Sequence, residues 1–124
     1  MSGMRAVSAS LLLAVAACAS EVYRRDAVLS APPAAAPTRI EIVKEAYLQL
    51  PGGYARALPQ GSVWNLRGGL PEGAVYRRAN GIFTVEGAHV HEAYLVIAAS
   101  QLVGFYLPVE KAFAPFSPVN LSIK

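Results

Sequence analysis

The alternation of apolar and polar positions predicts β-strands over most of the chain after residue 38. Short runs rich in Val, Ile, Tyr, Phe and Trp are separated by turns that contain glycine or proline, which is the pattern typical of strands. These turns fall at residues 51–53, 59–61, 68–73, 81, 87, 104 and 108. We therefore predict an all-β domain, a small antiparallel meander of about five or six strands that forms a partly closed barrel.

Two similar segments support the meander. LPQGSVWN at residues 58–65 and LPEGAVYR at residues 70–77 both contain Leu-Pro, then a glycine, a valine and an aromatic residue at the same spacing. The proline and glycine suit a tight turn, and the valine and aromatic residue suit a strand. The repetition predicts two turn-and-strand units in succession.

The dipeptide Asn80-Gly81 predicts a first hairpin. Both residues tolerate the positive φ angles of a type I′ turn, the turn that best matches the twist of paired strands. This turn would join residues 74–78 to residues 82–85.

A second hairpin is predicted near the C-terminus, where residues 89–97 would pair with residues 102–107 through a turn at 98–101. Gly104 lies inside the second of these strands. A glycine at such a position usually marks a bulge or a bend, which would help a small sheet to close on itself.

Two segments have a less regular pattern. Residues 39–50 fit both the alternation of a strand and the periodicity of a helix, and the strand is favoured. After Pro108 the aromatic residues are interrupted by prolines, so we expect a loop that packs against the sheet and then frays. The residues concerned are Phe113, Pro115, Phe116 and Pro118.

The N-terminus has the pattern of a targeting segment. Residues 1–17 combine a short basic start with an apolar stretch too short to span a bilayer, as in a signal peptide. The sequence Val15-Ala16-Ala17-Cys18 resembles the lipobox of bacterial lipoproteins. This resemblance implies that a diacylglyceryl group is attached to Cys18, that residues 1–17 are removed and that the new amino terminus is acylated.

Two other roles for Cys18 are a catalytic nucleophile and an inert buried thiol. A nucleophile needs a neighbouring base and a shaped pocket, whereas Cys18 ends a targeting segment, so lipid attachment is favoured. Ala19 is not the aspartate that retains some Gram-negative lipoproteins at the inner membrane. The resemblance therefore implies an outer-membrane location facing the periplasm, with the membrane as a partner through the lipid.

Residues 18–38 are rich in alanine and proline, which predicts a flexible tether between the lipidated cysteine and a domain at 39–124. The chain of 124 residues is sufficient for one small domain. Its net charge of +3 is spread along the sequence rather than clustered, so no nucleic-acid partner is expected.

Candidate chemistry is limited to two histidines. On one strand, His89 and His91 would project from the same face and could begin a zinc or copper site, with Glu86 reaching them only if the turn at Gly87 folds it back. Glu92 would point to the opposite face. The simpler interpretation places both histidines on the solvent side of a strand, and it is favoured.

Catalytic chemistry is not expected. The single aspartate, Asp26, precedes the predicted domain, and no serine lies in a nucleophile elbow. Most aromatic residues of the strands are expected in the core, although Phe105 and Tyr106 must face opposite sides of the sheet. An exposed group of aromatics would instead form a binding patch.

These observations predict a non-catalytic envelope lipoprotein whose small β domain binds or scaffolds another envelope component, with no cofactor. A partner could add a strand to an exposed sheet edge. The alternative is a periplasmic domain that binds a metal or a small ligand through His89 and His91.

Overall fold

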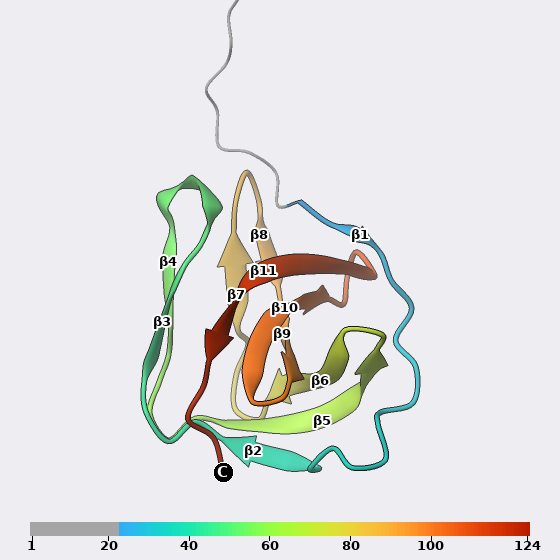
Figure 1. Ribbon diagram of the computed structural model, residues 1–124. Coiled ribbons are helices and arrows are strands. Elements are labelled where there is room, and N and C mark those ends of the chain that lie inside the picture. Colours follow the sequence, from blue (N-terminus) through green and yellow to red (C-terminus); the bar gives the residue numbers. More distant parts are fainter. Residues whose placement is uncertain (1–22) are drawn as a thin grey trace, which may run out of the picture.

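The computed structural model describes residues 23–124. A seven-stranded antiparallel sheet has the order β1-β11-β10-β9-β6-β5-β2, and two hairpins, β3-β4 and β7-β8, are attached to it (Figure 1). The strands are β1 (Arg25–Asp26), β2 (Arg39–Glu41), β3 (Ala46–Gln49), β4 (Ala55–Leu58), β5 (Val63–Leu70), β6 (Gly73–Arg78), β7 (Thr84–Glu86), β8 (Val90–Glu92), β9 (Tyr94–Ala98), β10 (Gln101–Leu107) and β11 (Ala112–Asn120).

The large sheet curls so that β2, the strand at one edge, approaches the residues that follow β11. Glu41 and Lys124 exchange backbone hydrogen bonds of 2.9 and 3.1 Å, and Ile42 forms an isolated bridge with Ile123. The predicted all-β, antiparallel and partly closed architecture is therefore confirmed, although it has more strands than expected.

The local signals in the middle of the chain are confirmed. The two repeated segments lie on neighbouring strands, because β5 pairs with β6 and Leu70 lies opposite Gly73. The second hairpin forms between β9 and β10. The register shifts between Leu102 and Gly104 in both pairings of β10, so Gly104 lies at the predicted bulge.

The hairpin predicted at Asn80-Gly81 is wrong. β6 pairs with β5 and β9, whereas β7 pairs with β8. Gly81 has a φ of +85°, but Asn80 does not adopt the positive φ that a type I′ turn also requires. The dipeptide therefore forms an open bend, and the chain leaves the large sheet to build the β7-β8 hairpin.

The strand predicted over residues 89–97 is interrupted. It divides into β8 and β9 at Ala93, whose N–H donates to the carbonyl of Phe83 at 2.9 Å. Residues 39–50 likewise form two strands, β2 and β3, which confirms strand over helix but not a single continuous strand.

The C-terminal segment forms a strand where a loop was expected. β11 runs from Ala112 to Asn120 along β10, despite Pro115 and Pro118. β1 covers the opposite edge of β11 only at Ala112 and Phe113. Among residues 23–124, no strand pairs with the rest of that edge, so a proline there does not interrupt strand pairing on both sides of β11.

Residues 25–37 also differ from expectation, because they pack along the sheet instead of forming a tether. β1 pairs with β11, and Ser30 and Gly69 exchange backbone hydrogen bonds of 2.9 and 2.8 Å. The Tyr76 hydroxyl donates to the carbonyl of Pro37 at 2.8 Å. The ordered domain thus begins well before Arg39; residues 18–22 lie outside the described part of the chain.

Both faces of the large sheet are apolar, because one face lines the inner core and the N-terminal segment covers the other. Phe105 belongs to the inner core with Trp64, whereas Tyr106 lies on the other face with Tyr94 and Phe113. Ala27 and Leu29 cover that second face. The aromatic residues of the strands of the large sheet are buried rather than gathered in an exposed patch: Trp64, Tyr76, Tyr94, Phe105 and Tyr106.

Residues 23–124 contain no helix with the length and apolar character that crossing a membrane would require.

Candidate functional site

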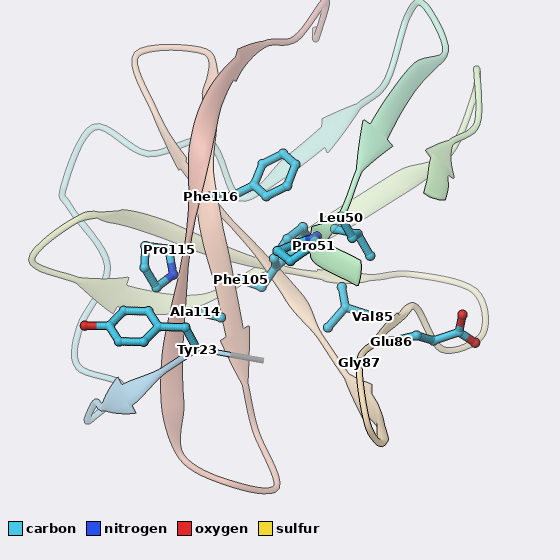
Figure 2. Close-up of a pocket in the computed structure, with 10 residues that line it drawn as sticks. All are labelled: Tyr23, Leu50, Pro51, Val85, Glu86, Gly87, Phe105, Ala114, Pro115 and Phe116. Atoms are coloured by element: carbon cyan, nitrogen blue, oxygen red, sulfur yellow. The ribbon is translucent and has the colours of Figure 1, made fainter. Parts of the chain in front are cut away.

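An apolar hollow with a cavity volume of about 60 Å³ opens to solvent where the two hairpins meet the large sheet (Figure 2). It is bounded by the end of β3, the β7-β8 turn, β10 and β11. The lining residues are Tyr23, Leu50, Pro51, Val85, Glu86, Gly87, Phe105, Ala114, Pro115 and Phe116.

The first wall is formed by the tip of the β3-β4 hairpin. Leu50 follows β3 and its N–H donates to the carbonyl of Tyr54 at 2.7 Å. Between them, Pro51–Gly53 forms a short 3-10 turn in which Gly52 has a φ of +84°, a conformation that glycine adopts without strain. This turn holds Leu50 and Pro51 against the hollow.

The second wall is formed by the β7-β8 hairpin. Val85 is buried and faces the hollow, and its strand neighbour Glu86 projects its carboxylate away from the other lining side chains (Figure 2). The turn is closed by the N–H of Gly87, which donates to the carbonyl of His89 at 3.0 Å.

Arg56 on β4 connects these two walls. Its Nε donates to the backbone carbonyl of Thr84 at 2.8 Å, and its guanidinium also contacts the Thr84 hydroxyl. One terminal nitrogen lies 3.9 Å from the carboxylate of Glu86. The hairpins therefore hold a defined spacing across the hollow through a side chain that does not line it.

The floor of the hollow is aromatic. The rings of Phe105 and Phe116 lie with centroids 5.6 Å apart, and Phe105 stacks on Phe83 at 6.2 Å. Phe105 is buried, whereas Phe116 is partly exposed and extends into the hollow (Figure 2). The floor is thus continuous with the inner core.

Tyr23 lines the hollow from the N-terminal side. It is 75% exposed and precedes β1, so the chain reaches the domain beside this opening. Cys18, the predicted lipid attachment site, is five positions earlier in the sequence and lies outside the described residues. The hollow and the predicted anchor are therefore close along the chain.

The lining determines which ligands fit. Among residues 23–124, Glu86 is the one charged residue that lines the hollow, and its carboxylate points elsewhere. A polar ligand placed there would lose hydrogen bonds to water without regaining them, whereas an apolar ligand gains from burial. The hollow suits a hydrocarbon group.

The predicted histidine pair is arranged differently from expectation. Val90 is 63% exposed and His91 is only 5% exposed, so the prediction that His91 lies on the solvent side is wrong. The reason is that the turn before β11 covers this face of β8. The Nδ1–H of His91 donates to the Glu110 carboxylate at 2.7 Å.

The pKa of Glu110 reflects this contact. Partial burial acts to raise the pKa, but hydrogen bonds from His91 and from the backbone N–H of Glu110 oppose it. The charges of His91 and Arg24 add to the lowering, and the net result is a pKa below the ordinary value of a glutamate. Glu110 is therefore held ionised.

His89 is exposed, and its ring lies 6.4 Å from that of His91 with the planes nearly perpendicular. Across residues 23–124, no three or more His, Cys, Asp and Glu side chains gather as they would around a metal ion. Neither histidine lines the apolar hollow.

Sequence reasoning did not identify the hollow. Leu50, Val85 and Phe116 come from three distant segments, and only the sheet topology brings them together. The available signal was the Leu50-Pro51 pair beside two glycines, which marks a hairpin tip with apolar residues. Comparisons with protein-family models, curated proteins and solved structures found no match for the chain.

Proposed function

We propose that the protein is a non-catalytic, lipid-anchored component of the bacterial cell envelope whose β domain binds another envelope component in the apolar hollow. The observation that carries this proposal is the position of the hollow, which is lined by Tyr23 at the end of the domain where the N-terminal segment arrives. A binding site for an apolar group and the predicted anchor thus lie at one end of the molecule.

The lipobox resemblance at Val15–Cys18 supports the anchor. The segment from Cys18 to Tyr23 spans at most about 18 Å when fully extended. Since residues 25–37 pack on the sheet, they do not lengthen this connection. The domain would therefore lie against the membrane. Because residue 19 is alanine and not the retention aspartate, that membrane would be the outer membrane, on its periplasmic face.

The composition of the hollow supports binding. Ligand sites are typically concave and mostly apolar, and this hollow, although small, has both properties. Its walls are preformed, because Arg56 bonds one hairpin to the other and because Leu50 and Val85 pack in the inner core. A preformed site loses little conformational entropy when a ligand enters.

The proposal is tested by purifying the full-length protein from envelopes in a mild detergent and measuring which lipids and proteins remain bound. Phe116→Ser removes an aromatic side chain of the hollow, and Tyr47→Ser removes an exposed one outside it. We expect a bound component that is retained by Tyr47→Ser and depleted in Phe116→Ser. Equal retention by both variants would contradict a binding role for the hollow.

A further inference from the structure

We infer that the ligand of the hollow is the end of one acyl chain of a membrane phospholipid in the leaflet beside the domain. This inference rests on the proposed anchoring at Cys18 and names the component that the proposed function leaves open. It follows from the chemistry of the lining, the position of the opening and the interrupted edge of the neighbouring strand.

The lining matches a hydrocarbon chain. Leu50, Val85 and Phe105 present apolar surface, and the partly exposed Phe116 extends this surface toward solvent. A methylene chain gains free energy when its apolar surface leaves water, and it has no group that needs a hydrogen bond. Within residues 23–124, a sugar or a charged headgroup would find few hydrogen-bonding side chains along this lining, with the Tyr23 hydroxyl at its edge.

The opening is placed to receive such a chain. The β3-β4 tip, the β7-β8 tip and the N-terminal entry lie at one end of the domain, whereas the C-terminus lies at the other (Figure 1). With an anchor no more than about 18 Å from Tyr23, this end faces the bilayer. Tyr23 and Tyr54 are both exposed there, and tyrosine is a residue that favours the membrane-water interface.

A peptide is a poorer occupant. A bound strand gains most of its affinity from main-chain hydrogen bonds to a sheet edge. β11 is the strand beside the hollow, and Pro115 and Pro118 remove backbone donors from it. An acyl chain forms no main-chain hydrogen bonds, so the two prolines do not weaken its binding.

Photolabelling in vesicles tests the inference. The full-length lipidated protein is reconstituted into vesicles of phosphatidylethanolamine and phosphatidylglycerol that contain a phosphatidylcholine with a diazirine at the end of one acyl chain. After illumination, adducts are mapped by mass spectrometry. We expect adducts on residues that line the hollow, such as Leu50 and Phe116.

Two exposed tyrosines give a matched pair of variants. Tyr23 and Tyr47 are each 75% exposed, so neither replacement by serine removes a core side chain, but only Tyr23 lines the hollow. We expect Tyr23→Ser to reduce labelling of Leu50 and Phe116 several-fold and Tyr47→Ser to leave it unchanged. Labelling that avoids the hollow, or that is equal in the two variants, would overturn the inference.

The outcome separates this inference from the proposed function. If the hollow takes no photolabel while the bound component found in detergent still depends on Phe116, the occupant is not a phospholipid chain but the binding role stands. If the hollow takes no photolabel and no bound component depends on Phe116, the phospholipid assignment and the binding role of the hollow both fail. A hollow already filled by the acyl chain on Cys18 would also exclude the photolabel and would overturn the phospholipid assignment.

Discussion

Arg56 on β4 donates a hydrogen bond from its Nε to the backbone carbonyl of Thr84 on β7, at 2.8 Å, and so joins two hairpins that share no strand pairing. These hairpins are the opposite walls of the apolar hollow. Arg56 therefore helps to hold the two walls at their spacing.

Replacing Arg56 by alanine should loosen the walls. The lost bond has a charged donor but is partly exposed, so we expect the free energy of unfolding to fall by about 1 kcal/mol. Trp64 is the single tryptophan and is fully buried, so its fluorescence reports unfolding in urea. The exposed Arg77→Ala variant is the control, and an equal loss in both would show that Arg56 has no special role.

Gly68 should tolerate no side chain. A Cβ at this position would lie 2.7 Å from Cγ of Leu29 and 2.8 Å from the carbonyl oxygen of Ser30. Gly68→Ala should therefore push the N-terminal segment off the sheet and destabilise the protein by about 1–3 kcal/mol. Limited proteolysis should show faster cleavage within residues 25–37, whereas Arg67→Ala, at the exposed neighbouring position, should not.

Acid should weaken the contact between Glu110 and His91. Because the folded-state pKa of Glu110 is lowered, its ionised form stabilises the fold above the pKa of the unfolded chain, and this contribution is lost as the pH falls through the folded-state value. Unfolding measured from about pH 6 to pH 3 should show a steeper loss of stability in the wild type than in Glu110→Gln.

The exposed Glu45→Gln variant should follow the wild type in the same titration. Identical pH profiles for Glu110→Gln and the wild type would mean that the hydrogen bond at 2.7 Å contributes nothing to stability.

Replacing Cys18 by serine should release the protein from membranes without unfolding the domain. Several acyl chains, each buried at about 0.8 kcal/mol per CH₂, give stable anchoring, and serine accepts none of them. The measurement is fractionation of envelopes, with Trp64 fluorescence of the released protein as the check on folding. A Cys18→Ser protein that stays in the membrane fraction after high-salt washing would contradict the anchor.

Local features of the fold were predictable from the sequence. The β9-β10 hairpin and the bulge at Gly104 depend on a few neighbouring residues, and both formed as expected. The hairpin at Asn80-Gly81 has an equally strong local signal, yet β9 occupies the edge of β6 that β7 would have used. Tertiary pairing overrode the turn preference.

The remaining differences arise from contacts between distant segments. In the sequence, Ala27 and Leu29 belong to a segment that has the composition of a linker. In the structure they cover the apolar outer face of the sheet, which includes Tyr94 and Tyr106. The prolines of β11 obscured it as a strand; they are tolerated because, within residues 23–124, one edge of β11 pairs with β1 only at Ala112 and Phe113. The hollow depends both on the ordered N-terminal segment and on β11, so no single motif could have predicted it.

The most direct test of the account is photo-crosslinking in growing cells, with a photoreactive amino acid introduced at Phe116 in the anchored, full-length protein. The account predicts a discrete envelope adduct from position 116 and none from the equally introduced control at Tyr47, which is exposed outside the hollow. Adducts at both positions, or at neither, would contradict the claim that the hollow is the binding site.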